Sequence, residues 1–241
     1  MPGGEHSPVA VLDRISTLLD AFDDRERLTL SELARRTGFP RSSTHRMLVQ
    51  LVRLRWIRRC GDAYELGMKM FELGALALHH DRLHRSALPI LHRLHAATGL
   101  VVHLGVLAGD DVLYLEKIGG DLGPMVPSRV GGRQPARRTA LGKSMLASID
   151  ACASTAAPEP FRRELAAIRE RDVAHDRDEA ALGLSCVAAT IGDRWTTVGA
   201  LSVCGPTGRF HSWALEGPVR AAAHAVWKSI ESGYGARELP A

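Results

Sequence analysis

The chain of 241 residues is 45% hydrophobic and 24% charged, a composition typical of a globular protein that buries a core in one or two domains. It contains no run of 18 apolar residues and no signal-peptide pattern, which argues against a membrane partner and predicts a cytoplasmic protein. The four cysteines are Cys60, Cys152, Cys186 and Cys204. They are widely spaced and form no CxxC pair, which argues against a disulfide framework and against a zinc site.

The positive charge is concentrated between Leu33 and Gly61, a segment that holds eight arginines and no aspartate or glutamate. Since the net charge of the whole chain is only +4, the remaining residues together carry more negative than positive charge. A local patch of one sign is typical of a surface that binds a polyanion. The alternative is a solvated arginine-rich face without a partner.

Three helices are predicted in the first part of the chain. Apolar residues at helical spacing predict a first helix that ends near Asp23. Thr29 and Glu32 match a capping box, and Gly38 suits a helix end, so a short second helix is predicted between them. Pro40 fits the first turn of a third helix, because its missing N–H group is not needed there.

The second and third helices are joined by a glycine-containing turn, which is the helix-turn-helix pattern. In this pattern the N-terminal end of the later helix enters the major groove of DNA. That end carries hydroxyl, imidazole and guanidinium groups that suit phosphates and base edges. We therefore predict that the DNA-binding residues include Arg41, Ser42, Ser43, Thr44, His45 and Arg46. The alternative is a three-helix packing module with no role in nucleic-acid binding.

Two short strands around Gly61 and Asp62 follow and predict a hairpin, which after a recognition helix is a wing. Arg58 and Arg59 lie on its first strand and are predicted to contact the DNA backbone. Because side chains alternate along a strand, the two arginines point to opposite faces, and only one of them needs to reach a phosphate. Residues 8–67 are thus predicted to form a winged helix-turn-helix domain.

A connector helix is predicted from Gly67 to about Arg85, and we assign residues 68–85 to a linker. It contains His79, His80 and His84, and histidines at positions i and i+4 can share a metal ion. Since no cluster of cysteines or carboxylates accompanies them, we predict a solvated helix and no metal site.

Residues 86–241 predict a mixed α/β domain with a largely antiparallel sheet, so that the whole chain is of the α+β class. A helix from Ala87 to Thr98 precedes two predicted hairpins. The second hairpin is the more continuously apolar and therefore the more deeply buried. Strands are predicted at residues 101–107, 112–118, 184–191 and 198–204. Helices are predicted at residues 140–149, 161–171 and 218–232, with a loop at 151–160.

No catalytic group is predicted in this domain. Cys186 and Cys204 lie in buried strands without a histidine at a telling spacing, and a catalytic thiol needs a base or a positive environment. The segment ending in Gly142, Lys143 and Ser144 matches the end of a nucleotide-binding loop. The glycine that this loop requires five positions earlier is replaced by Arg137, so nucleotide binding is not predicted.

Five motifs in the same order resemble those of IclR-family transcriptional regulators over roughly residues 9–234: Leu30–Leu48, Tyr64–Gly67, Thr139–Ser144, Gly183–Ala189 and Leu201–Pro206. The resemblance implies a winged helix-turn-helix, a linker helix that dimerises, and a GAF-like domain that binds a small, often carboxylate-bearing metabolite. It also implies a dimer or a pair of dimers.

In proteins of this family the segment that corresponds to Thr139–Lys143 starts a helix that lines the effector pocket. A helix start offers free N–H groups and the positive end of the helix dipole, so it can hold a carboxylate. By position, the resemblance implies effector contacts from Ala140, Leu141, Asp176, Leu184, Cys186, Ser202 and Cys204. Independently of the family, a spacing of two places Ser202 and Cys204 on one strand face, and Leu184 and Cys186 likewise.

Three features depart from the family pattern. Arg137 and Arg138 replace a usual His-Ala pair, Cys204 stands where serine is common, and the connection between residues 149 and 161 is short. An added arginine could clamp a carboxylate or stay on the surface, and a thiol donates a weaker hydrogen bond than a hydroxyl. The chemistry of the effector is therefore open.

Together these features predict a sequence-specific transcriptional regulator, repressor or activator, whose affinity for a double-stranded DNA operator is modulated by a small carboxylate-bearing effector. No cofactor is predicted. One alternative is a metabolite-binding enzyme with a regulatory winged-helix appendage. Another is an interaction module whose winged helix binds a second protein.

Overall fold

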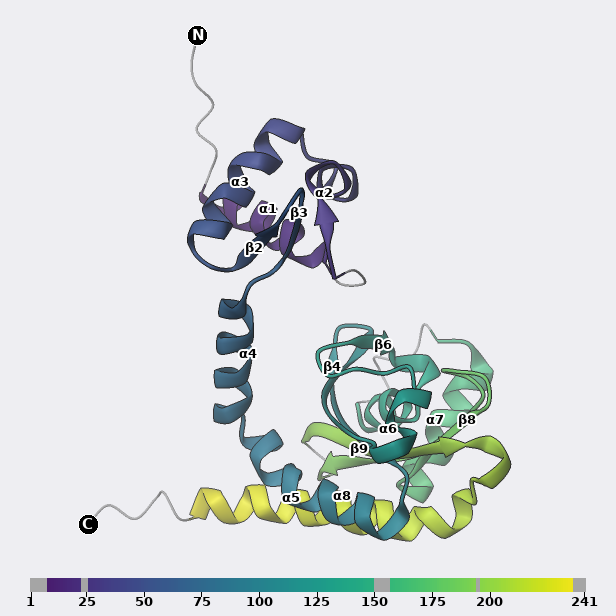
Figure 1. Cartoon of the computed structure of the whole chain (residues 1–241). Helices are drawn as coiled ribbons and strands as arrows, with labels where there is room; N and C mark the ends of the chain where they lie inside the picture. Colours follow the sequence, from purple (N-terminus) through teal and green to yellow (C-terminus); the bar gives the residue numbers. More distant parts are fainter. Residues whose placement is uncertain (1–7, 23–25, 150–156, 194–195, 236–241) are drawn as a thin grey trace, which may run out of the picture. The chain divides into compact units, whose positions relative to one another are not determined.

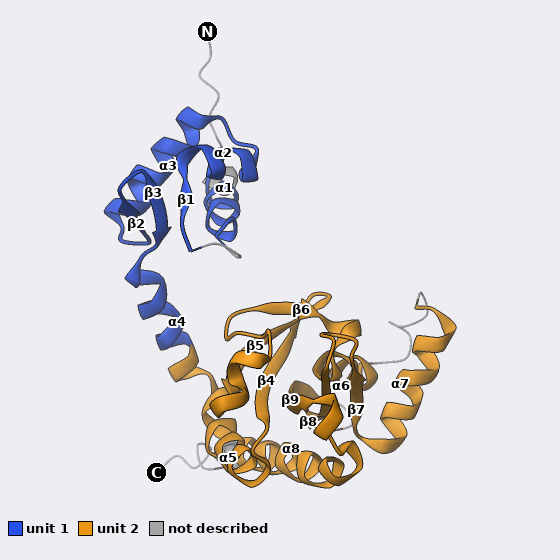
Figure 2. Ribbon diagram, turned by 45° about the vertical axis from the view of Figure 1, so that its right-hand side comes forward, with its two compact units in different colours: residues 1–77 blue, residues 78–241 orange. Residues whose placement is uncertain are grey.

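The computed structural model describes residues 8–22, 26–149, 157–193 and 196–235 of the chain (Figure 1). The protein forms two compact units, residues 1–77 and residues 78–241 (Figure 2). Each unit is built around buried apolar clusters of its own.

The first unit contains three helices and a small sheet of strand order β1-β3-β2. The helices are α1 (Pro8–Asp20), α2 (Leu30–Thr37) and α3 (Arg41–Arg53), and the strands are β1 (Leu28–Thr29), β2 (Ile57–Cys60) and β3 (Ala63–Leu66). Its core combines one side of each helix with the first residue of the wing, and includes Leu18, Leu33, Leu48, Leu51 and Ile57. The helix-turn-helix and the wing predicted from the sequence are therefore present.

The ends of these helices follow the predicted signals closely. Thr29 caps α2, and the reciprocal bonds with Glu32 that define a capping box are both formed. Gly38 ends α2 in the left-handed conformation, with a φ of 71°. Pro40 differs from the prediction, because it is the residue before the first turn of α3 rather than part of it. Helix α1 ends at Asp20, and its expected end near Asp23 lies outside the described residues.

The single connector helix predicted from Gly67 to Arg85 is wrong, because the chain forms two helices there. Helix α4 spans Met68–His80 and α5 spans Arg82–Thr98. Asp81 stands between them in an extended conformation, and its side chain accepts a hydrogen bond from the N–H group of His84 at 2.6 Å. A side chain that caps a new helix in this way separates it from the preceding one.

The second unit is built on a six-stranded sheet of order β6-β5-β4-β9-β8-β7, in which every neighbouring pair is antiparallel. The two predicted hairpins are its central strands. The remaining strands, β6 and β7, are short and were not predicted. The strands are β4 (Val101–Ala108), β5 (Asp111–Ile118), β6 (Arg133–Pro135), β7 (Ala174–Arg177), β8 (Leu184–Gly192) and β9 (Thr197–Pro206).

Helices cover both faces of this sheet. Helices α5 and α8 (Ser212–Gly235) lie side by side on one face and bury alternate residues of the central strands, such as Val187, Leu201 and Val203 (Figures 1 and 2). Helix α6 (Ala140–Ser148) covers the other face, and α7 (Glu159–Arg171) packs against α6. Short 3₁₀ turns span Gly120–Met125, Ala136–Arg138 and Thr207–Arg209. The loop predicted at 151–160 lies largely outside the described residues.

Candidate nucleic-acid interface and effector cavity

The N-terminal end of α3 presents its polar side chains to solvent. Arg41, Ser42, His45 and Arg46 are exposed and Ser43 is half-buried, while the core of the unit takes Leu48 and Leu51 from the same helix. One guanidinium N–H group of Arg41 donates to the hydroxyl of Ser31 on α2, which ties this arginine to the neighbouring helix. The arrangement gives a basic, hydroxyl-bearing surface of the kind that fits a DNA groove.

Thr44 corrects part of the prediction. Its side chain is 0% exposed, and its hydroxyl donates to the carbonyl oxygen of Pro40 at 3.2 Å. A buried hydroxyl with this partner cannot reach a base or a phosphate. Thr44 lies four residues before Leu48 and so belongs to the buried stripe of the helix.

The two arginines of the wing have different partners. Arg58 and Arg27 both form ion pairs with the carboxylate of Glu65 on β3. The hydrogen bond from Arg27 is the main cause that holds the pKa of Glu65 below its usual range. Arg59 remains exposed and donates from Nε to the carbonyl oxygen of Gly61 at 2.9 Å.

The second unit contains a cavity between the start of α6 and the sheet, with a volume of about 30 Å³. All seven residues that the resemblance implied as effector contacts line it. Side chains from other parts of the unit complete the wall, and the full lining is His103, Tyr114, Val126, Pro127, Ser128, Gln134, Thr139, Ala140, Leu141, Asp176, Ala180, Ala181, Leu184, Cys186, Ser202 and Cys204.

The start of α6 supplies backbone donors to this cavity. Thr139 caps the helix, and its hydroxyl accepts from the N–H group of Gly142 at 3.0 Å. Ala140 and Leu141 are buried, and within the described part of the chain their N–H groups have no hydrogen-bond acceptor. Gly142 lets the preceding turn approach, because a Cβ atom there would lie 2.2 Å from the carbonyl oxygen of Ala136.

The half of the cavity on β4, β5 and β6 is polar and uncharged. The imidazole of His103 lies 2.8 Å from the hydroxyl of Ser128 and 3.4 Å from that of Ser202. Burial, helped by the charge of Lys117, lowers the pKa of His103 to about 3, so the ring is neutral. Tyr114 packs edge-on against this ring and donates to Oε1 of Gln134 at 2.9 Å, and burial raises the pKa of its phenol.

The opposite half of the cavity contains Asp176 on β7. Its Oδ1 atom accepts from the N–H groups of Glu179, at 2.9 Å, and Ala180, at 3.4 Å. Burial raises the pKa of this carboxyl above its ordinary value, although the two hydrogen bonds oppose that shift. The carboxyl thereby fixes the turn that brings Ala180 and Ala181 to the cavity wall.

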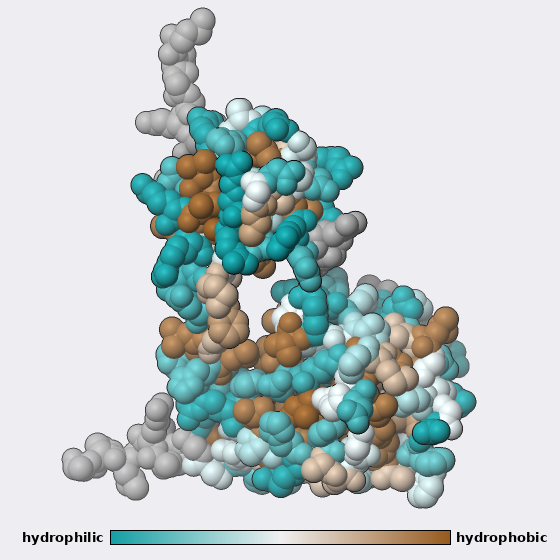
Figure 3. Space-filling model, in the orientation of Figure 1, coloured by the Kyte–Doolittle hydropathy of each residue, from teal (hydrophilic) through white to brown (hydrophobic). Residues whose placement is uncertain are grey.

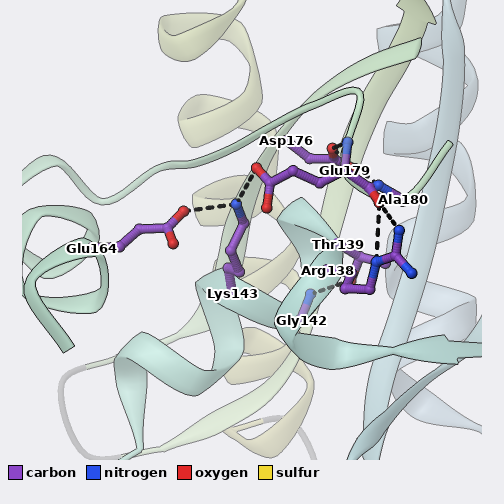
Figure 4. Close-up of polar contacts among 8 residues, drawn as sticks. All are labelled: Arg138, Thr139, Gly142, Lys143, Glu164, Asp176, Glu179 and Ala180. Atoms are coloured by element: carbon purple, nitrogen blue, oxygen red, sulfur yellow. Dashed lines mark hydrogen bonds and ion pairs between the residues drawn. The ribbon is translucent and has the colours of Figure 1, made fainter. Parts of the chain in front are cut away.

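Glu179 is held at each of its polar groups (Figure 4). Asp176 accepts its N–H, Arg138 donates to its carbonyl oxygen at 3.1 and 2.6 Å, and Lys143 donates to its carboxylate at 2.7 Å. Lys143 is 0% exposed and also donates to Glu164 on α7 at 2.7 Å. Burial alone lowers the pKa of Lys143, but the two carboxylates outweigh it and raise the pKa.

The basic residues near α6 therefore point away from the cavity. Arg138 and Lys143 bind Glu179, and Arg137 lies over the ring of Phe161 at 5.4 Å. Among the described residues that line the cavity, none is a lysine or an arginine. The arginine pair that departs from the family pattern thus has structural partners on the surface.

Sequence reasoning missed the uncharged half of this cavity. His103 is a single polar residue in an otherwise apolar strand, on the face opposite Val102 and Leu104. A buried polar residue needs a partner, so this pattern could have indicated a polar cavity. Ser128 and Gln134 come from irregular segments and a three-residue strand, so no periodic pattern marks them. His84, considered as a metal ligand, instead pairs with Glu116 at 2.9 Å.

Two properties of the described residues bear on function classes. None of their helices is both long and apolar enough to cross a membrane. No group of three or more histidine, cysteine, aspartate or glutamate side chains among them is placed to hold a metal ion.

Comparisons with known proteins match this architecture. The chain matches the IclR helix-turn-helix domain over residues 11–61, and the bacterial transcriptional regulator IclR C-terminal domain over residues 75–157 and 149–228. The HTH-type transcriptional regulator KdgR of Escherichia coli K12 is 29% identical, over 94% of this chain and 93% of the relative. KdgR of Dickeya chrysanthemi is 30% identical, over 82% of this chain and 71% of the relative.

Among solved structures, an IclR homolog from Microbacterium hydrocarbonoxydans complexed with 4-hydroxybenzoate superposes with a TM-score of 0.82. It is 25% identical and covers 92% of this chain and 99% of its own. The matched domains and relatives are transcriptional regulators, and nothing among them favours the enzyme alternative. The chain belongs to the IclR family and is a DNA-binding transcriptional regulator.

Proposed function

We propose that the exposed start of α3 reads the operator and that a small carboxylate bound in the cavity modulates that binding. The observation that carries the DNA contact is the solvent-exposed set of Arg41, Ser42, His45 and Arg46 at one helix end. Arg59 on the wing is the better candidate for a phosphate contact, because Arg58 already pairs with Glu65.

The effector is proposed to place its carboxylate on the N–H groups of Ala140 and Leu141. These donors lie at a helix start, where the dipole favours negative charge, and no lysine or arginine is among the described residues that line the cavity. The relative that is complexed with 4-hydroxybenzoate is consistent with a carboxylate ligand. Ser202 and Cys204, on the neighbouring strand, complete the proposed contact.

The cavity must enlarge when an effector enters. Its volume of about 30 Å³ is room for about two water molecules. We infer that the irregular walls move, namely the turn after β7 and the segment 126–128, since strands β8 and β9 are fixed by their ladder. Lys117 holds the second of these walls by donating to the carbonyl oxygens of Val126 and Ser128 at 2.7 and 2.6 Å.

The apolar surface of α4 supports a homo-oligomer. Met68, Phe71 and Leu76 are 67%, 69% and 52% exposed, and Figure 3 shows residues in the tan and brown of apolar hydropathy along this helix. A helix with an exposed apolar face gains free energy by packing against a second copy. We propose that α4 dimerises, giving a dimer or a dimer of dimers that binds paired operator half-sites.

Effector binding then acts by shifting the population of two arrangements of the oligomer. A ligand can do so only through a difference in its affinity for the two states. The proposed source of this difference is the cavity wall, which has to move before the effector fits.

Sequencing of genomic fragments captured by the purified protein would identify an operator for quantitative tests. In a titrated gel shift on that operator, Arg46→Ala should weaken binding by about tenfold to a hundredfold. The matched control is Arg163→Ala, which removes an exposed arginine from α7 in the second unit. The affinity of the unchanged protein should also fall steeply with salt, by about 0.9 log units per log unit for each phosphate neutralised.

Equal operator affinity for Arg46→Ala and the unchanged chain would refute the assignment of α3. Loss of binding in both arginine variants would show only a general charge effect, which also contradicts a specific role for the start of α3.

A further inference from the structure

Cys186 and Cys204 face each other across two central strands of the second unit. They are direct Cα partners in the antiparallel ladder between β8 and β9. Their neighbours Val187 and Val203 point to the α5 and α8 face, so both thiols point to the opposite face, where they form part of the cavity floor. The register alone therefore brings the two sulfur atoms together.

The two sulfur atoms are close enough to bond with little movement. The Sγ atoms lie 2.7 Å apart, with the thiol of Cys186 donating to Cys204. This is ~0.7 Å beyond the length of a disulfide bond. The ladder of paired residues is continuous on both sides of the two cysteines, from Leu184 opposite Pro206 to Ile191 opposite Gly199, and holds their backbones in place.

The cavity gives a small oxidant a way to reach these thiols. Both line it, although Cys204 is only 2% exposed. The hydrogen bond to Cys204 and burial raise the pKa of Cys186 well above its usual value, so its thiolate is scarce at neutral pH. Oxidation of this pair is therefore slower than that of an exposed thiol. The product that forms, rather than the rate at which it forms, tests the proposal.

We propose that Cys186 and Cys204 are an oxidation site that forms an internal disulfide on exposure to a hydroperoxide. One thiol sulfur attacks an oxygen atom of hydrogen peroxide and breaks the O–O bond, and the departing hydroxide takes the thiol proton, which gives a sulfenic acid and water. The second thiol then attacks this sulfur and expels a second water molecule. Two thiols and one peroxide thus become one disulfide and two waters.

The disulfide alters the cavity floor. It removes the thiol hydrogen of Cys186 and joins β8 to β9 covalently beside Ser202, a proposed effector contact. The DNA-contacting residues lie in the other compact unit and contain none of these atoms. Oxidation therefore changes the cavity directly and leaves the side chains of the proposed DNA surface chemically unaltered.

The test is peptide mapping of the full-length protein after graded exposure to hydrogen peroxide, with free thiols blocked by alkylation before digestion. Trypsin cleaves after Arg177, Arg194 and Arg209, which places Cys186 on the peptide 178–194 and Cys204 on the peptide 195–209. The expected result is a linked pair of these peptides, lighter than their sum by two hydrogen atoms. Reduction should release both, and a non-reducing gel should show a monomer.

Cys60→Ser is the matched control and should leave the linked pair unchanged, whereas Cys204→Ser should abolish it. The proposal is overturned if both peptides remain separately alkylated while Cys60 is oxidised. A link to Cys60, to Cys152 or to a second chain overturns it equally, as does a sulfinic or sulfonic product at Cys186 or Cys204. Operator binding is measured on the same protein before oxidation. Specific binding there, without the linked peptides after oxidation, contradicts the disulfide and leaves the proposed function standing.

Discussion

The two units of this protein present chemistry in opposite ways. In the first, the candidate residues Arg41, His45 and Arg46 point outward from a helix whose other side is core. In the second, the candidate residues point inward, and the cavity combines neutral His103 with a buried carboxyl at Asp176. The outward surface carries fixed charge that suits a polyanion, whereas the described residues that line the cavity include no lysine or arginine. In both units apolar side chains fill the core. The polar side chains left over face solvent on a surface helix, but they enclose a cavity on a sheet face that a helix covers.

The largest expected effect concerns the neutral imidazole inside the second unit. Burial lowers the folded-state pKa of His103 to about 3 from 6.5, so the unfolded chain binds a proton over this range and the folded chain does not. His103 therefore contributes its full stabilisation above about pH 6.5 and loses it as the pH falls toward 3. The free energy of unfolding should drop by about 1.4 kcal/mol per pH unit, or about 5 kcal/mol in all.

Denaturant unfolding of the second unit between about pH 6 and pH 4, followed by peptide-resolved hydrogen exchange, measures this slope. His103→Gln should flatten it, while His45→Gln, at an exposed histidine of α3, should not. An unchanged slope in His103→Gln would show that other groups cause the acid sensitivity of the second unit.

Alanine in place of glycine should have opposite effects on stability at Gly142, which is crowded, and at Gly74, which is open. Gly142→Ala forces a Cβ atom against the carbonyl of Ala136 and should lower the stability of the second unit by about 3 kcal/mol. Gly74→Ala, in the exposed helix α4, meets no atom within 4 Å and should stabilise that helix by about 0.5–1 kcal/mol. Hydrogen exchange in the peptides that cover α6 and α4 should therefore change in opposite directions. Faster exchange in both variants would contradict the distinction.

A comparably small effect tests Thr44, the one predicted DNA-contact residue that is buried. Thr44→Val keeps the shape of the side chain but removes its hydrogen bond to Pro40, and should cost about 1 kcal/mol of stability. Operator affinity in a gel shift should stay unchanged, whereas Ser42→Ala, at the exposed surface of the same turn, should reduce it. Weaker operator binding by a folded Thr44→Val protein would show that Thr44 contacts DNA after all.

Much of this arrangement could be predicted from local signals. The capping box at Thr29 and the glycine at 38 predicted the second helix. Alternation in the second hairpin predicted that Ser202 and Cys204 share a strand face, as do Leu184 and Cys186. These predictions succeeded because caps and strand periods depend on neighbouring residues. The family resemblance, rather than any periodicity, selected the seven cavity residues from the others.

The rest depended on long-range contacts. Thr44 was assigned to the DNA surface because the helix start is polar, but the position of the core decides which threonine is buried. The break at Asp81 is a single capping bond within an otherwise helical pattern. Gln134 reaches the cavity through pairing of a three-residue strand with β5, and so short a strand has no recognisable period.

The ion pairs of Glu65 also bear on how the wing meets DNA. Because Arg27 and Arg58 already share this carboxylate, the hairpin is preorganised before any duplex arrives, and little conformational entropy remains to be lost on association. A phosphate that recruits either arginine has to displace an internal counter-ion first. On the proposed DNA interface, Arg58 is therefore expected to contribute less attraction than the start of α3.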